Sequence, residues 1–469
     1  MIRVARDHRL RVAMIGTRGV PARYGGFETC IEEVGSRLVE RDIDVVVYCR
    51  RIPGTTEPEQ LTHRGMRLVQ LPALRTRALE TLSHTSLSVA HQLLHPADVA
   101  LVFNAANAPL LPVLRARRIP VATHVDGLEW RRAKWGPTGR RYYRGAESLA
   151  VRWSDALIAD ATGIADYYVN EFGAAPDLIS YGAPILADTP SDGLAGLDLE
   201  PGRYHLVVAR FEPENHVEEI VAGYRRSGAR LPLVVVGSAP YADEYTLRVR
   251  AAADERVRFL GGVWDQGLLD QLYAHCLTYL HGHSVGGTNP SLLRAIGAGA
   301  PSVAYDVPFN REVLRGAGRF FRTPDDVARA VERAEEDPAG ERARGEEGRE
   351  QAKRYDWDDV AGSYEVLCRR LAAAAPVRRP TGRRTRTIPA PASAHDADDA
   401  HSDDGARGDP VDGAANRASG GAANRASERA PDGAANRPAD GPVNGAADGQ
   451  ARGSAQFERE NQDRPTEVR

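Results

Sequence analysis

The chain has 469 residues, which is too long for one ordinary domain and predicts two or three. Its 64 acidic and 61 basic residues give a formal net charge of −3, which argues against a chain-wide nucleic-acid-binding surface, so we expect no nucleic-acid partner. Lys134 and Lys353 are the only lysines, which leaves almost no room for Schiff-base or Walker-type phosphate chemistry.

Cysteines and histidines give no metal-binding pattern. The four cysteines are scattered and form no CxxC pair, so neither a disulfide framework nor a cysteine zinc site is expected. His281 and His283 form an HxH pair without carboxylate partners, and no HExxH, GxSxG or P-loop motif is present. We therefore expect a reduced, cytoplasmic protein without a metal site.

The last part of the chain differs in composition from the rest. Residues 372–469 contain no Leu, Trp, Tyr or Met, and Phe457 is their only aromatic residue. Such a segment cannot bury enough apolar surface to offset chain entropy, which predicts a disordered, low-complexity tail. Its basic cluster is either part of a solvated tail or a peripheral contact with anionic lipid on the inner face of the cell membrane. The cluster consists of Arg378, Arg379, Arg383, Arg384 and Arg386.

The first half begins with a strand, a glycine-rich loop, a helix and a second strand. Leu10–Ile15 is a short apolar run, and the loop Thr17–Gly26 follows it. Apolar residues recur through Phe27–Arg41 at the spacing of an amphipathic helix, and Asp44–Cys49 is the next buried strand. This order predicts the start of a doubly wound parallel sheet. Further strands are predicted at Met66–Leu71, Val99–Phe103, Val121–His124 and Ala156–Ala159.

A second strand-helix series follows a linker rich in proline, glycine and aspartate, at Gly182–Gly202. The predicted strands are His205–Ala209, Leu231–Gly237, Val257–Leu260, Leu277–Leu280 and Pro301–Tyr305. The predicted helices are Val217–Ser227, Leu268–Ala274 and Ser291–Ala298. The sequence thus predicts an α/β protein of two Rossmann-like halves that face each other across a cleft, with its chemistry in the loops after the strands.

The strongest local signal is the segment SVGGTNPS at Ser284–Ser291, between a predicted strand and a predicted helix. Asn289 suits the helix N-cap and Pro290 the first helical position. Gly286 and Gly287 allow a close backbone approach. Amides and a positive dipole end at such a helix N-terminus favour an anion such as a diphosphate. A plain glycine turn with a good cap is the alternative interpretation.

Two further features are expected at the same cleft. The loop Gly16–Gly26 has the same geometry in the first half, although it is not a GxGxxG dinucleotide fingerprint. Arg210 follows a predicted strand and is able to bind a phosphate through two parallel hydrogen bonds. It is equally able to pair at the surface with Glu212 or Glu214.

Polar and aromatic residues are dense in HVDGLEWRRAKWG, at His124–Gly136. Asp126 is a candidate proton acceptor, and Trp130 or Trp135 is a candidate to stack on a sugar ring. An isolated histidine such as His124 is more often structural, and the tryptophans are equally typical of an interface core.

Four segments, in this order, resemble the bacterial family-four glycosyltransferases, and most closely their rhamnosyltransferase-like subgroup. They are TRGVPARYGGFETCIEEVGSRL at 17–38, VDGLEWRRAKWG at 125–136, ARFEPEN at 209–215 and GHSVGGTNPSLL at 282–293. The resemblance covers about residues 10–371. Tyr355–Trp357 and Tyr364 are similar to the family's closing segment, whose helix crosses back to the first domain.

The resemblance implies a GT-B fold with the nucleotide-sugar donor in the second domain and the acceptor in the first. Residues 1–185 are then the N-terminal acceptor domain, onto which residues 350–371 cross back. Residues 200–349 are the C-terminal donor domain, and residues 372–469 are the disordered tail.

The resemblance also assigns candidate site residues. Gly25 and Gly26 match the first-half loop that faces the donor phosphates. The donor-binding candidates are Arg210, His216, Ser284, Gly286, Gly287, Thr288, Asn289 and Arg294. The catalytic candidates are Asp126 and His124, and the acceptor-side candidates are Trp130 and Arg131.

The implied reaction moves a sugar, rhamnose in the subgroup, from a nucleotide diphosphate donor to a lipid-linked or polysaccharide acceptor in cell-surface glycan synthesis. It retains the anomeric configuration and needs no metal or other cofactor. Two positions depart from the family pattern: Arg294 replaces a glutamate that binds ribose hydroxyls, and His216 replaces a lysine. Because arginine cannot accept a hydrogen bond, a non-catalytic sugar-nucleotide-binding or assembly protein is the alternative.

Overall fold

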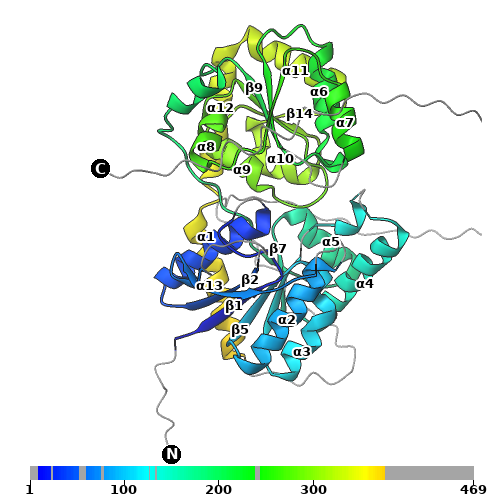
Figure 1. Cartoon of the computed structure of the whole chain (residues 1–469), viewed down its shortest axis with the longest axis vertical. Coiled ribbons are helices and arrows are strands. Elements are labelled where there is room, and N and C mark those ends of the chain that lie inside the picture. Colours follow the sequence, from blue (N-terminus) through cyan, green and yellow to red (C-terminus); the bar gives the residue numbers. More distant parts are fainter. Residues whose placement is uncertain are drawn as a thin grey trace, which may run out of the picture. The chain divides into compact units, whose positions relative to one another are not determined.

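The computed structural model describes residues 9–22, 25–51, 60–74, 79–125, 127–132, 135–237 and 243–374. The described residues form two β-sheets, each with helices on both faces (Figure 1). From residue 375 onward, the predicted tail and its arginine cluster lie outside the described residues.

The first sheet has the strand order β3-β4-β2-β1-β5-β6-β7-β8. Neighbouring strands pair in parallel, except for the antiparallel pair β3 and β4. Its strands are β1 (Arg11–Ile15), β2 (Asp44–Arg50), β3 (Thr62–His63), β4 (Met66–Leu71), β5 (Val99–Phe103), β6 (Val121–Val125), β7 (Ala156–Ala159) and β8 (Asp177–Leu178).

Strand β1 shows why this sheet needs helices on both faces. Val12 and Met14 belong to one hydrophobic cluster, whereas Ala13 and Ile15 belong to a second. Because successive side chains of a strand point to opposite faces, both faces of the sheet are core. The covering elements are α1 (Gly26–Glu40), α2 (Glu80–Leu94), η1 (Ala105–Leu110), α3 (Leu111–Ala116), η2 (Glu129–Arg131), α4 (Pro137–Trp153) and α5 (Thr162–Phe172).

The second sheet is parallel throughout, with the order β11-β10-β9-β12-β13-β14. Its strands are β9 (His205–Val208), β10 (Leu233–Val236), β11 (Val257–Gly261), β12 (Thr278–His281), β13 (Ser302–Tyr305) and β14 (Arg319–Phe321). The helices of this half are η3 (Asp192–Leu197), η4 (Pro213–Asn215), α6 (Val217–Arg226), α7 (Asp243–Ala251), α8 (Gln266–Ala274), α9 (Pro290–Gly297), α10 (Pro308–Leu314), η5 (Arg315–Ala317), α11 (Pro324–Glu336) and α12 (Pro338–Ala352).

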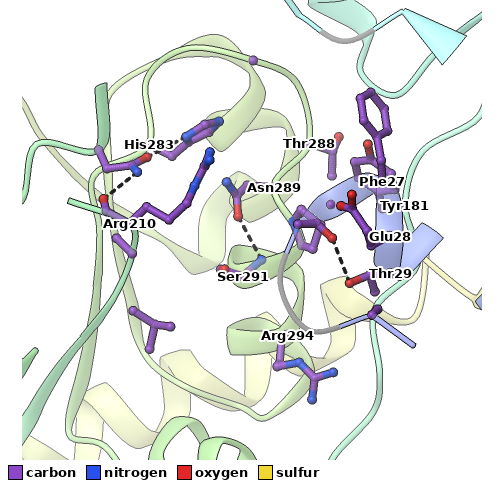
Figure 2. A pocket seen from close by; sticks show the side chains of 18 of the residues that line it. Phe27, Glu28, Thr29, Tyr181, Arg210, His283, Thr288, Asn289, Ser291 and Arg294 are labelled. Carbon is purple, nitrogen blue, oxygen red and sulfur yellow. Dashed lines mark hydrogen bonds between the residues drawn. The ribbon is translucent and has the colours of Figure 1, made fainter. Parts of the chain in front are cut away.

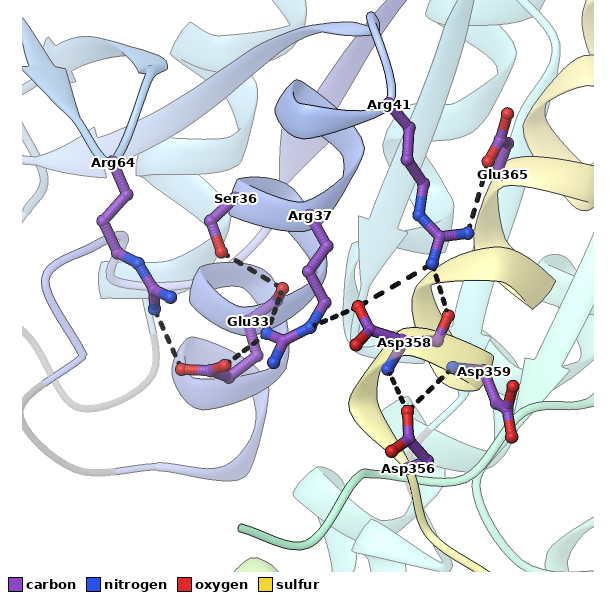
Figure 3. Close-up of polar contacts among 9 residues, drawn as sticks. All are labelled: Glu33, Ser36, Arg37, Arg41, Arg64, Asp356, Asp358, Asp359 and Glu365. Carbon is purple, nitrogen blue, oxygen red and sulfur yellow. Dashed lines mark hydrogen bonds and ion pairs between the residues drawn. The ribbon is translucent and has the colours of Figure 1, made fainter.

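The last described helix, α13 (Trp357–Ala373), packs along α1 of the first half. Figure 3 shows the polar contacts between these helices: Arg37 Nε lies 3.1 Å from Asp358 Oδ1, and Arg41 Nη1 lies 3.4 Å from Glu365 Oε2. The same two helices also meet at the buried Tyr364 hydroxyl of α13, which lies 3.6 Å from Cys30 Sγ of α1. The first described element, strand β1, and the last, helix α13, therefore both belong to the first half.

The predicted fold class is confirmed, with two Rossmann-like sheets in the predicted order. The predicted strand ends differ from the observed ones by two residues at most. Three short strands, β3, β8 and β14, were not predicted, because two or three residues are too few to show a periodic pattern. The predicted linker is partly regular, since it contains η3. No described helix is both long and apolar enough to cross a membrane.

Candidate functional site

A cavity of about 1750 Å³ lies among the loops that follow the strands of both sheets. Gly16 follows β1 and Asp160 follows β7, whereas Arg210 and Gly282 follow β9 and β12, and all four residues line it. Parallel sheets bind their ligands beyond the C-terminal ends of the strands, so this position suits a ligand site. Among the residues that the structure describes, no group of His, Cys, Asp and Glu side chains is arranged to hold a metal ion.

The glycine turn after β12 leads into helix α9 at the edge of the cavity (Figure 2). Gly286 has a φ of 142°, a conformation that favours glycine. Asn289 caps the helix, because its Oδ1 accepts a hydrogen bond from the Ser291 amide at 2.9 Å, and Pro290 occupies the first turn. The predicted cap is therefore confirmed, and the Leu292 and Leu293 amides bond to the Asn289 main-chain oxygen, so α9 begins at the edge of the cavity with its first amides satisfied.

The first-half loop faces this turn. Gly25, with a φ of 118°, stands at the N-cap of α1 without a side-chain cap. A Cβ atom added to Gly26 would lie 3.3 Å from Pro290 Cγ, so the starts of α1 and α9 approach closely. Figure 2 shows both starts at the same cavity. Two positive helix ends therefore converge there, an arrangement that favours an anionic group.

Arg210 also lines the cavity. Its side chain is half exposed, and its Nη1 lies 3.4 Å from Glu212 Oε1. The predicted pairing with Glu212 is therefore present, and the residue also borders the cavity, while phosphate binding by Arg210 stays a prediction. A half-exposed ion pair is weak, so the guanidinium can exchange Glu212 for a bound phosphate.

Two predicted donor residues lie behind the turn and are absent from the cavity lining. His216 Nε2 is 3.0 Å from Ser284 Oγ, and the His216 ring stacks on Tyr305 with 3.9 Å between ring centroids. Ser284 Oγ in turn donates a hydrogen bond to the Glu214 carbonyl at 3.0 Å. These contacts hold His216 and Ser284 as a support for the turn.

Of the described candidates in and after β6, Trp135 lines the cavity, whereas His124, Trp130 and Arg131 do not. His124 is 1% exposed, and its ring stacks against Phe103 and Tyr181, while burial lowers its pKa to about 3 and keeps the imidazole neutral. The structure therefore places His124 in the core, because the ring points between aromatic neighbours. The Arg131 and Arg144 guanidinium groups each lie about 5 Å from the centre of the Trp130 ring, which is absent from the cavity lining. Asp126 lies outside the described residues.

Arg294 lines the cavity from helix α9. Its Nη1 forms an ion pair with Asp270 Oδ1 of helix α8, and both side chains are mostly buried. Arginine has no hydrogen-bond acceptor. The ion pair places the Asp270 carboxylate, which does accept hydrogen bonds, next to Arg294.

The prediction from sequence missed a cluster of charged residues centred on Arg132. Its Nε lies 2.5 Å from Glu129 Oε2, and its Nη1 lies 3.3 Å from Glu214 Oε1 and 3.8 Å from Glu212 Oε2. Arg132 belongs to the first half and the last two glutamates to the second, so this cluster joins the halves at the cavity. Burial raises the pKa of Glu214, an effect that the Arg132 charge opposes.

Asp160, at the end of β7, is a second residue that was not predicted. It lines the cavity although only 4% of the residue is exposed, and its main-chain oxygen accepts a hydrogen bond from Thr288 Oγ1 at 2.7 Å. Burial raises the pKa of its carboxyl group to about 7. The position was detectable in the sequence, because an aspartate directly follows a predicted strand.

Removing the cap of α9 should destabilise the second half. We expect Asn289→Ala to lower the free energy of unfolding by about 1 kcal/mol, because the Ser291 amide loses its partner. Asn289→Gly is the matched control. Glycine is tolerated at N-caps, so this substitution should lower the free energy of unfolding by only a few tenths of about 1 kcal/mol. Urea denaturation followed by circular dichroism measures both. Equal losses for the two variants would contradict a capping role.

Comparisons with known families divide the chain as the two sheets do. Residues 25–182 match the glycosyl transferase 4-like domain, and residues 198–351 match the glycosyl transferases group 1 family.

Two curated relatives are mannosyltransferases. O-antigen chain mannosyltransferase B of Escherichia coli is 27% identical over 178 residues, which is 35% of this chain and 46% of the relative. Phosphatidyl-myo-inositol mannosyltransferase of Mycobacterium leprae is 33% identical over 236 residues, which is 47% of this chain and 57% of the relative. The chain thus spans about half the length of the curated relatives that it matches.

Solved structures share the fold at low identity. Sucrose-phosphate synthase of Thermosynechococcus elongatus has a TM-score of 0.68 at 20% identity, over 78% of this chain and 100% of that one. HepE of Anabaena, solved with UDP and glucose, has a TM-score of 0.62 at 16% identity, over 77% of this chain and 100% of that one. The chain therefore has the GT-B fold, and its two halves match glycosyl transferase 4-like and glycosyl transferases group 1 domains.

Proposed function

We propose that this protein is a retaining glycosyltransferase that uses a nucleoside diphosphate sugar as its donor. The observation that carries the proposal is the convergence of two helix N-termini and Arg210 on one cavity. The departing diphosphate gains negative charge in the transition state, and preorganised amides and a guanidinium stabilise such charge. The family domains and the GT-B fold support the same reaction class.

The proposed chemistry assigns roles to this chain's own groups. The turn at Gly286–Thr288 and Arg210 would bind the diphosphate, and Gly25 and Gly26 would face it from the first half. The acceptor hydroxyl would attack from the same face that the diphosphate leaves, and the departing phosphate oxygen would take its proton. We propose that neither a metal nor another cofactor takes part, so turnover should persist in the presence of a chelator.

The sugar is the least constrained part of the proposal. The resemblance of the motifs favours rhamnose, whereas both curated relatives are named as mannosyltransferases. A hexose or deoxyhexose covers both. For the acceptor we propose a lipid-linked or polysaccharide molecule of cell-surface glycan synthesis, reached by a cytoplasmic enzyme with peripheral contact to the membrane.

The alternative is a non-catalytic protein that binds sugar nucleotides or takes part in assembly. Arg294 is the observation in its favour, because it replaces a hydrogen-bond acceptor in the family pattern. Its ion pair with Asp270 places a carboxylate beside the guanidinium, but Asp270 itself is absent from the residues that line the cavity.

Incubation with a panel of nucleotide sugars and lipid-linked or polysaccharide acceptors separates the two functions. We expect one donor, together with one acceptor, to release nucleoside diphosphate at a rate well above that of the acceptor-free reaction. Arg294→Glu should then be neutral or harmful, because it places two carboxylates side by side at Asp270. Folded protein that binds a donor but never turns over, and gains activity in Arg294→Glu, would support the alternative instead.

A further inference from the structure

The carboxyl group of Asp160 stands in direct contact with the glycine turn after β12. A Cβ atom on Gly287 would overlap the Asp160 carboxyl oxygens, so the carboxyl fills the space that a side chain would take. The backbone of Asp160 is held in place, because its carbonyl oxygen accepts the Thr288 hydroxyl. The carboxyl group therefore lies against the backbone to which we assign diphosphate binding.

One oxygen of this carboxyl group has no hydrogen-bond partner. Oδ1 of Asp160 is buried and lacks a partner among the described residues, although the residue lines the cavity. An ionised carboxylate in such a place is costly, because the effect of burial outweighs the one backbone hydrogen bond that the group receives, from the Asp160 main chain. An unpartnered buried oxygen that faces a cavity points to a missing hydrogen-bonding group from a ligand.

The surroundings of Asp160 favour its neutral form. Glu312 of α10 is the charged neighbour that raises its pKa further, beyond the effect of burial. Burial raises the pKa of Cys30 in α1 and of Tyr364 in α13, and the charge of an ionised Asp160 would raise both further. Both groups are therefore neutral. His124 of the neighbouring strand β6 is neutral as well. No cation therefore faces Asp160 from these elements in the part of the chain that the structure describes.

We propose that Asp160 binds the donor diphosphate as a neutral carboxyl group, which donates its O–H in a hydrogen bond, and that donor binding takes up this proton from solution. The inference rests on the proposed function, because it needs a diphosphate at the glycine turn. A carboxylate beside a diphosphate would repel it, whereas a carboxyl group offers it a donor.

The proposal fixes the sign of a pH effect. The bound diphosphate raises the proton affinity of Asp160, so the proton is held more tightly in the complex than in the free protein. Donor affinity is then constant at low pH and falls as the pH rises above about 7, by about five- to tenfold up to about pH 8. Net proton uptake on binding should approach one in the same range.

Isothermal titration calorimetry with UDP-glucose and GDP-mannose tests the proposal on the full chain. Both probes are diesters on the diphosphate, so their phosphate charge stays constant over the range from about pH 6 to pH 8.5. Titrations in two buffers of different ionisation enthalpy count the protons that binding takes up. Asp160→Asn, an isosteric and permanently neutral donor, should bind at every pH within about threefold of the wild type at pH 6, without proton uptake.

Glu312→Gln is the matched control. It removes the charged neighbour but not the proposed donor, so the pH dependence should persist with its break at lower pH. This variant and the wild-type proton count decide the proposal even if thermal unfolding shows that Asp160→Asn does not fold.

Each outcome separates the inference from the proposed function. Wild-type binding without pH dependence or proton uptake would overturn the inference alone. The same is true of an unchanged pH dependence in Asp160→Asn, since a group other than Asp160 would then take the proton. A folded wild type that binds neither probe at any pH would contradict donor binding itself, and the inference with it.

Discussion

Replacing Arg210 with alanine should lower kcat/KM by about 10²- to 10³-fold, the cost of removing one preorganised donor to a developing oxyanion. The guanidinium lies at the cavity and carries the only side-chain cation that we assign to the diphosphate. Because the diphosphate gains charge as it leaves, most of the loss should appear in kcat. Steady-state rates with the donor and acceptor found in the panel give this value.

Two other arginine variants sharpen this result. Arg210→Lys should recover part of the activity, because it keeps the charge but not the two parallel hydrogen bonds. Arg226→Ala removes an exposed arginine of the same half, which pairs with Asp325 away from the cavity, and should leave kcat/KM unchanged. If Arg210→Ala and Arg226→Ala have the same activity, Arg210 does not bind the diphosphate.

The strands that build the halves are readable in the sequence, because their apolar runs serve a sheet with two buried faces. Leu233 and Val235 of β10 pack on one side of the second sheet, while Val234 and Val236 pack on the other. Such a strand shows no polar alternation and is recognised by its length and its β-branched residues.

The glycine turn could be predicted for a local reason. Its geometry depends on residues that are neighbours in the chain, namely the glycine with positive φ, the Asn289 cap and Pro290. A cap and a turn need no partner from elsewhere, so their sequence signature carries over to the structure.

The rest of the site depends on contacts between distant segments. Asp160 meets Gly287 only because the ends of β7 and β12 approach each other. His124 is also a polar residue near a strand end, but its ring stacks between aromatic side chains of the first half instead of facing the cavity. A single sequence does not say which of two residues beyond a strand end faces the cavity.

The Arg132 cluster leads to the largest expected change in stability. Arg132→Met should lower the free energy of unfolding by about 3–5 kcal/mol at about pH 8, because it leaves buried carboxylates without their cation. Only 12% of the Arg132 side chain and 3% of the Glu214 side chain are exposed, so water at the cavity solvates Glu214 poorly in place of the lost partner. Urea denaturation at several pH values measures the loss.

The loss should shrink in acid. Burial already raises the pKa of Glu214, and removal of Arg132 raises it further. A carboxyl group with a raised pKa in the folded state contributes stability that is present below its unfolded pKa and is lost as the pH rises through the folded pKa. The deficit of Arg132→Met relative to the wild type should therefore be smaller at about pH 5 than at pH 8.

Two comparisons distinguish this effect from a general loss of packing. Arg226→Met breaks an exposed pair with Asp325 and should cost less than about 0.5 kcal/mol at either pH. Adding Glu214→Gln to Arg132→Met should recover part of the stability at pH 8, because it removes an uncompensated buried charge. If the deficit is the same at both pH values and the second substitution restores nothing, Arg132 acts through its apolar stem. If the deficit follows the pH as expected, the glutamates beside the cavity depend on a cation from the first half.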